Sequence, residues 1–215
     1  VVDAMDAAGN VARFSRQVLL DLHDLLLSVQ LAEGAEFVSG DTVPVHLEAS
    51  DANGVVAMRS APDRASLEDA PWVPFSPAYI LDAGETDGPV EHWVQARDGA
   101  NRTAVAWDTT VVDRLPPTGS VVVGTGEGVV HSVDVTLKLE AADGTSGVAH
   151  VMVSNSASFT GAEEMEPVDE MEWTLPAGEG EHAVHYMVVD RAGLSSVHEA
   201  VVVLNTVPPA GTVSI

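Results

Sequence analysis

A step of 92 residues relates successive parts of this 215-residue chain to one another. Three turn-like segments, DAAGN, DGANR and DRAGL, are 92 residues apart (98 − 6 = 92; 190 − 98 = 92) and begin at Asp6, Asp98 and Asp190. At the same offset after each turn comes an apolar run, and these runs end at Asp21, Asp113 and Asn205. A fixed period of this length predicts a tandem array in which each repeat is one structural unit.

Two pairs of prolines mark the expected repeat boundaries. Pro116-Pro117 and Pro208-Pro209 are again 92 residues apart, so the register is kept across the linkers. We therefore predict one complete repeat at 24–115 and a second at 116–207. The flanks are expected to be the C-terminal strands of a preceding repeat at 1–23 and the first strand of a following repeat at 208–215. Because a lone terminal hairpin cannot bury its apolar face, we expect the array to continue on both sides.

The segment 133–141 has the pattern of a half-buried strand. Apolar and polar residues alternate, which places one face on a core and the other in water. The apolar positions are Val133, Val135, Leu137, Leu139 and Ala141. Further short strands are expected near 119–124, 148–154, 171–176, 181–189 and 197–204, between clusters of Gly, Pro, Asp and Ser. Six or seven short strands in such a unit predict an all-β fold of tandem immunoglobulin-like antiparallel β-sandwiches.

The second repeat and the residues after it read in succession DGTSGVAHVMVSN, EWTL, GEGEHAVHYMVVDRAG and VVVLNTVPPAGTVSI, and the turn DAAGN stands at 6–10 and the linker PPTGS at 116–120. In this succession the chain resembles the bacterial immunoglobulin-like repeats of large secreted and surface proteins. The turn DRAGL at 190–194 and the linker DLHDLLL at 21–27 depart from the family pattern. The resemblance implies a fold and an array without naming a ligand, because such repeats serve as stalks, filament subunits, surface-layer pieces and adhesin modules.

The charge balance excludes several classes of partner. The chain has 9 basic and 33 acidic residues, a net charge of −24, which repels phosphate backbones and anionic lipid surfaces. We therefore expect no nucleic-acid partner and no direct membrane insertion. The sequence has no cysteine, so disulfides and thiolate metal sites are excluded. Its single lysine, Lys138, faces away from the predicted core, so no lysine–asparagine crosslink is expected.

Two groups of acidic residues are candidate calcium ligands. Asp6, Asp98 and Asp190 begin the three equivalent turns, where Asp and Asn also have a purely structural role in bonding their own backbone. In the alternative interpretation they bind calcium, joined by carboxylates from an adjoining repeat. The loop before the tryptophan strand holds the second group, which is either a solvated face or a cation site: Glu163, Glu164 and Glu166.

Aromatic residues gather in the first complete repeat. They are either sandwich packing or a carbohydrate-stacking surface, and they comprise Trp72, Phe75, Tyr79, Trp93 and Trp107. No residue pattern indicates catalysis, so the chain is not expected to be an enzyme.

The sequence thus predicts the repeat region of an extracellular or cell-surface stalk, filament or surface-layer protein. Its partners are neighbouring repeats and other copies of the chain. The alternatives are an adhesive or carbohydrate-binding module, or an accessory region of a secreted enzyme.

Overall fold

The computed structural model describes residues 2–14, 23–208 and 211. Its regular structure is nearly all β-strand, with short 3-10 turns η1 (Ala32–Gly34) and η2 (Ser66–Glu68). Strands β1 (Val2–Met5) and β2 (Val11–Phe14) form an antiparallel hairpin around the first Asp turn. Among the described residues no helix is long and apolar enough to cross a membrane. The predicted strand at 208–215 lies largely outside the described residues.

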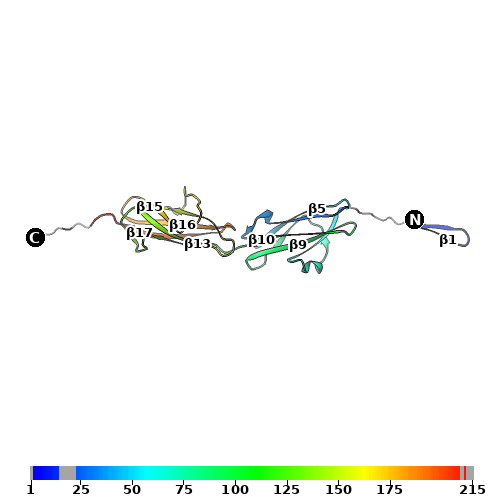
Figure 1. The fold of residues 1–215 in the computed structure, drawn as a ribbon. Helices are drawn as coiled ribbons and strands as arrows, with labels where there is room; N and C mark the ends of the chain where they lie inside the picture. The colour runs from blue at the N-terminus through cyan, green and yellow to red at the C-terminus, as the bar shows by residue number, and fades with distance from the viewer. Residues whose placement is uncertain (1, 15–22, 209–210, 212–215) are drawn as a thin grey trace. The chain divides into compact units, whose positions relative to one another are not determined.

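Two sheets form the first sandwich (Figure 1). One sheet has the order β3 (Leu26–Leu31), β5 (Thr42–Ser50), β8 (Ala78–Asp82). The other has the order β4 (Phe37–Val38), β10 (Thr103–Val112), β9 (Gly88–Asp98), β6 (Val55–Ala61), β7 (Val73–Pro74). Of the segment 18–31, residues 18–22 lie outside the described residues and residues 26–31 form strand β3.

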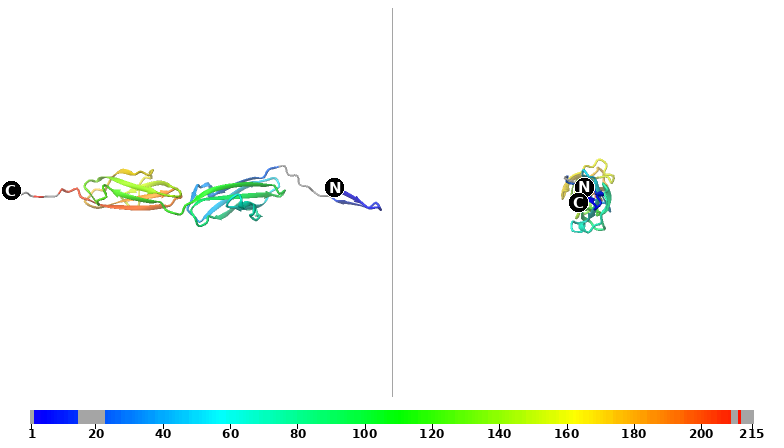
Figure 2. Two further views of the ribbon diagram at one scale, coloured as in Figure 1. Left: turned by 60° about the horizontal axis from the view of Figure 1, so that its bottom comes forward. Right: turned by 90° about the vertical axis from the view of Figure 1, so that its right-hand side faces the viewer.

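The second sandwich has the same layout. Its sheets run β11 (Thr118–Val123), β13 (Asp134–Ala142), β15 (Glu170–Thr174), and β12 (Val129–Val130), β17 (Ser195–Leu204), β16 (Gly180–Asp190), β14 (Val148–Ser154). All six predicted strands are present within two residues of their expected ends, and β12 is the short seventh. Figure 2 shows the two layers of each sandwich from other sides.

Equivalent strand pairs carry equivalent residues. Leu26 pairs with Ser50 in the first sandwich and Thr118 with Ala142 in the second, each 92 positions later (118 − 26 = 92; 142 − 50 = 92). In both sandwiches a two-residue strand also runs parallel to the last strand: β4 beside β10 and β12 beside β17. The boundaries at 24–115 and 116–207 stay a prediction.

Alternating side chains of β13 build the core of the second sandwich, as predicted. Val135, Leu137 and Leu139 are buried, whereas Lys138 on the opposite face is exposed. They pack in one apolar cluster with residues of β11, β14, β16 and β17, in which Tyr186 is fully buried. Removing this apolar area from water is the main stabilising contribution.

One glycine sets the approach of β11 to the facing sheet. A Cβ at Gly119 would lie 2.8 Å from Cγ2 of Val188, 2.9 Å from the carbonyl oxygen of Glu140 and 3.0 Å from Cδ2 of His198. These distances are too short for any larger residue. Gly119 therefore permits close packing of the two layers at this point.

Candidate functional site

Three aspartates converge beside the second sandwich. Asp113 follows β10 directly, Asp143 follows β13, and Asp190 is the last residue of β16. One carboxylate oxygen from each lies within 4.8 Å of the others, and Asp113 and Asp190 are buried. All three belong to one of the two compact units into which the chain divides, formed by residues 34–43, 80–90 and those from 109 onward. We call these residues the Asp cluster.

Backbone N–H groups hold the carboxylates of the Asp cluster in place. The Asp113 carboxylate accepts hydrogen bonds from the Leu115 N–H (3.1 Å) and the Ser146 N–H (3.0 Å). Oδ1 of Asp143 accepts from the N–H groups of Ser146 (2.8 Å) and Gly147 (2.7 Å). The loop after β13 thus wraps around one carboxylate oxygen and also bonds the carboxylate that enters from β10.

Asp190 has one satisfied oxygen and one that is not. Oδ1 accepts a hydrogen bond from the Leu194 N–H at 2.8 Å. Oδ2 is buried and has no hydrogen-bond partner. Burial raises the pKa of Asp190, the Leu194 N–H counteracts this, and the nearby carboxylates of Asp113 and Asp143 raise it further. An unpartnered oxygen between two other carboxylates is where a cation would be stabilised.

The donor set fits a hard divalent cation. Calcium takes oxygen ligands from carboxylates and backbone carbonyls, and three carboxylates supply the charge that a divalent ion requires. The cluster contains no nitrogen or sulfur ligand, which zinc sites generally use. Asp113, Asp143 and Asp190 would hold the ion, and the unpartnered Oδ2 of Asp190 would gain a partner.

Without a cation, the raised pKa of Asp190 makes this residue's contribution to stability less favourable at neutral than at acidic pH. The folded state keeps the Asp190 proton above the unfolded pKa of about 3.9. Its contribution is therefore most favourable below that pH and is lost as the pH rises through the folded pKa. In EDTA, we expect Asp190→Asn to gain stability relative to the native chain between pH 4 and pH 7. Urea unfolding of both proteins at the two pH values checks this, and a constant difference would contradict it.

The structure separates the other predicted calcium ligands. Asp6 lies in the exposed β1–β2 turn, where Oδ1 accepts from the N–H groups of Ala8 and Asn10, and Oδ2 accepts from the Asn10 side chain. Asp98 ends β9 in the first sandwich. The exposed loop carries Glu163, Glu164 and Glu166, and the Glu164 carboxylate lies 3.7 Å from Nε2 of His150. Calcium binding by these residues stays a prediction.

Asp113 and Asp143 were not predicted as ligands. Both were visible in the sequence as repeat anchors, because Asp113 ends an apolar run before the prolines and Asp143 lies 92 positions after Asp51. They are candidate ligands because of their positions in space, where the Asp113 segment approaches the loops that follow β13 and β16.

Two tryptophans of the first sandwich lie on the outer face of a sheet. Trp93 and Trp107 stack with ring centroids 5.2 Å apart and planes 15° apart, and Trp107 is 51% exposed. The guanidinium of Arg64 lies 5.5 Å from the Trp93 centroid. The neighbours of Trp93 in β9, His92 and Val94, point into the core instead. We call Trp93, Trp107 and Arg64 the aromatic face.

The other aromatic residues have different environments. Two guanidinium groups lie near the Trp72 ring, that of Arg59 at 4.8 Å and that of Arg97 at 4.5 Å from its centroid. Tyr79 Oη is 2.7 Å from Nε2 of the buried His92, so it borders the core. Tyr79 therefore packs against the core, whereas Trp93 and Trp107 lie on an outer face, and carbohydrate stacking stays a prediction.

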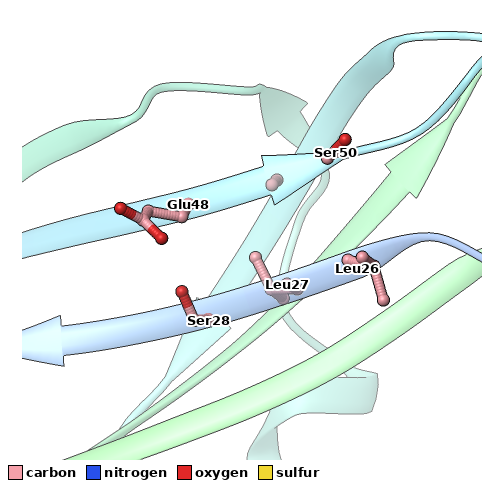
Figure 3. Close-up of a pocket in the computed structure, with 6 residues that line it drawn as sticks. Leu26, Leu27, Ser28, Glu48 and Ser50 are labelled. Atoms are coloured by element: carbon pink, nitrogen blue, oxygen red, sulfur yellow. The ribbon is translucent and has the colours of Figure 1, made fainter.

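Each sandwich also has a shallow hollow over its first strand pair. Figure 3 shows the hollow of the first sandwich, where Leu26, Leu27 and Ser28 of β3 lie beside Glu48 and Ser50 of β5. The second sandwich has a hollow at the equivalent place, lined by residues 118–119 and 140–142. Both are open to solvent, so neither has the form of an enclosed substrate site.

The strand order decides the type of sandwich. With β11 to β17 read as strands A, A′, B, C, E, F and G, one sheet is A-B-E and the other is A′-G-F-C. This arrangement of B and E against C, F and G is that of immunoglobulin domains. The fold is a tandem immunoglobulin-like β-sandwich.

Known structures include similar tandem repeats. A 1.5-MDa bacterial ice-binding adhesin matches with a TM-score of 0.50 and 12% identity over 84% of this chain and 63% of that one. Fibronectin(III)-like modules of Clostridium thermocellum CbhA match with a TM-score of 0.49 and 14% identity over 82% and 93% of the two chains. The chain thus spans less than two thirds of the adhesin fragment. No family model and no curated protein matches the sequence.

In immunoglobulin-like terms, the Asp cluster lies at the end of the second repeat where its chain enters. Asp143 belongs to the B–C loop and Asp190 to the F–G turn, two connections that share one end of such a sandwich. The Arg191 N–H bonds the carbonyl oxygen of Gly147 at 3.0 Å and joins the two loops. Asp113 comes from the segment that precedes the Pro116-Pro117 linker.

Proposed function

We propose that this chain is a repeat region of an extracellular, adhesin-like surface protein, in which calcium at the Asp cluster fixes the segment that joins successive immunoglobulin-like repeats. The observation that carries the proposal is the position of Asp113. This residue is 0% exposed, lies three residues before the proline pair, and accepts a hydrogen bond from the N–H of Ser146 in the second repeat. The similarity to an adhesin fragment supports the extracellular setting.

The next residue is held by loops of the first repeat. Nη1 of Arg114 donates to Oδ1 of Asp87 at 2.8 Å, Nε donates to Oδ1 of Asp41 at 2.7 Å, and Nη2 donates to the Gly84 carbonyl oxygen at 2.8 Å. The Arg114 N–H and guanidinium lower the pKa of Asp87, so this contact stays ionised at neutral pH. Adjacent residues of the linker are therefore anchored to different repeats. A cation at Asp113 would strengthen the second anchor.

Trypsin cleavage after Arg114 tests this role. Because proteolysis of a native chain requires local opening, we expect cleavage between Arg114 and Leu115 to be at least about tenfold slower in Ca²⁺ than in EDTA. Asp143→Asn should remove the difference. Cleavage after Arg13, in the exposed β1–β2 hairpin, serves as the internal measure of protease activity. Equal rates at Arg114 in both conditions would reject the proposal.

A stiff linker between repeats suits a stalk. The sequence also predicts that copies of the chain assemble into filaments. Unpaired edges of β3 and β11 are available on each sandwich for such contacts. Electron microscopy of the full-length protein checks assembly: regular fibres are expected, and isolated rods would contradict it.

A second candidate function, glycan binding, is favoured by the aromatic face. Stacked, partly exposed indole rings with a guanidinium beside them offer the apolar platform and polar donor that sugar rings use. The equivalent residues of the second repeat are His185 and Glu199, so only the first repeat has this platform (185 − 93 = 92; 199 − 107 = 92).

Trp107→Ala is expected to weaken binding on a glycan array by about tenfold, because it removes half of the stacked pair. Trp173→Ala is the matched control, since that indole lies in the second repeat and donates to Oδ1 of Asn155 at 2.8 Å. The native chain binding no glycan, or both variants binding as the native chain does, would dismiss this candidate.

A further inference from the structure

Three carboxylate oxygens among the described residues are buried and lack a hydrogen-bond partner. One is Oδ2 of Asp190, and the others are Oδ2 of Asp51 and Oδ2 of Asp98 in the first repeat. Asp51 and Asp98 lie 92 positions before Asp143 and Asp190 (143 − 51 = 92; 190 − 98 = 92). The first repeat thus buries unpartnered carboxylate oxygens at the positions that form the Asp cluster in the second repeat.

In both aspartates of the first repeat, one oxygen serves its own turn and the other does not. Oδ1 of Asp51 accepts a hydrogen bond from the Asn53 N–H at 2.6 Å. Oδ1 of Asp98 accepts from the N–H groups of Ala100 (2.7 Å) and Arg102 (2.9 Å). Asp98 is only 1% exposed, so water does not satisfy its second oxygen. Turn formation therefore accounts for Oδ1 of each aspartate. It gives Oδ2 no partner.

The two turns meet as their counterparts do. Asp98 pairs with Val55 across β6 and β9, and the Gly99 N–H bonds the Gly54 carbonyl oxygen at 3.2 Å. In the second repeat, Asp190 pairs with Val148, and the N–H after Asp190 bonds the Gly147 carbonyl oxygen at 3.0 Å. The loops that carry Asp51 and Asp98 are thus joined by the same kind of bond as those of Asp143 and Asp190, with the loop after Asp51 one residue shorter (147 − 54 = 93).

We propose that Asp51 and Asp98 form a second divalent-cation site, in the first repeat, for a hard cation such as Ca²⁺. Two carboxylates with buried, unpartnered oxygens are unfavourable unless a cation compensates them, and oxygen donors are the ligands that calcium prefers. The proposal rests on the proposed function for the identity of the ion. Asp21, which the repeat aligns with Asp113, lies outside the described residues and is not part of the site.

Arg102 makes the two sites unequal. It stands where the second repeat has Leu194 (194 − 102 = 92). Its backbone N–H donates to Oδ1 of Asp98, and its guanidinium donates to the carbonyl oxygen of His23 and forms an ion pair with Asp24. A positive charge at this place repels an incoming cation. The site of the first repeat therefore binds Ca²⁺ more weakly than the Asp cluster.

Calorimetric titration of Ca²⁺ into the EDTA-treated, desalted chain tests the second site. Two sites of unequal affinity are expected. Asp98→Asn should remove only the weaker one, and Asp143→Asn only the tighter one. Asp6→Asn is the matched control, because Asp6 begins an equivalent turn but is exposed, with both carboxylate oxygens bonded, and it should leave both sites intact.

Arg102→Leu, which introduces the residue of the second repeat, should tighten the weaker site on the order of tenfold. A gain in affinity cannot come from misfolding, so this variant guards against a folding defect in Asp98→Asn. A native chain that binds one Ca²⁺, with Asp98→Asn unchanged, would overturn the second site and leave the Asp cluster standing. A chain that binds no Ca²⁺ would overturn both.

Discussion

Addition of Ca²⁺ to the EDTA-treated protein is expected to raise the melting temperature of the second repeat by about 10–20 °C. An ion that binds only the folded state, at a free concentration 100 times its Kd, stabilises by about 2.7 kcal/mol. For a domain of about 100 residues each kcal/mol shifts the melting temperature by about 4–8 °C. Differential scanning calorimetry with and without Ca²⁺ measures the shift.

Two variants separate the Asp cluster from general screening of the negative charge. Asp143→Asn should abolish the shift, because Asp143 supplies a carboxylate of the cluster. The triple variant Glu163→Gln, Glu164→Gln, Glu166→Gln removes three exposed charges and should preserve it. The opposite result, with the shift lost in the triple variant and kept in Asp143→Asn, would move the calcium site to the acidic loop.

Leu137→Ala is expected to destabilise the second repeat by about 2–5 kcal/mol. Leu137 is 0% exposed and lies at the centre of the cluster that includes Val151 and Tyr186. Truncation removes buried apolar area and leaves a cavity between two sheets that cannot fully close, because neighbouring strands hold their spacing. Chemical unfolding of the native and variant chains gives the free-energy difference directly.

Val197→Ala is the control for the core prediction. Val197 lies on the outer face of β17 and is 53% exposed, so its truncation should cost no more than about 0.5 kcal/mol. A loss of similar size in both variants would mean that β propensity, and not burial, controls the stability of this sandwich.

The strands were predictable because their signal is local. The alternation at 133–141 fixes which face of β13 is buried, and the period transfers that assignment along the chain. The order of strands within the sheets was less accessible, because it depends on contacts distant in sequence. The parallel pairing of Val129 with Val203 is an example, since two residues carry too little pattern to reveal a partner.

The Asp cluster was predictable only in part, for the same physical reason. Asp190 was a candidate because its turn recurs, and ligation together with carboxylates of an adjoining repeat was one of the two interpretations. Which aspartates join it depends on how the B–C loop folds around Asp143 and where Asp113 enters. Neither is encoded in spacing alone. The acidic loop at 163–166 drew attention by charge density, yet density of exposed charge does not produce a buried, unpartnered oxygen.

The short parallel strand pairs have a mechanical consequence. β12 follows β11 in the chain and runs parallel to the last two residues of β17, the strand from which the chain leaves. A pull on the two ends of the repeat drives these strands in opposite directions along their length. The hydrogen bonds between them, such as that from Asn205 N–H to the Val130 carbonyl oxygen at 2.9 Å, are then sheared together and not opened one after another. The same holds for β4 and β10. Each repeat therefore has a short parallel strand pair whose hydrogen bonds resist extension under load.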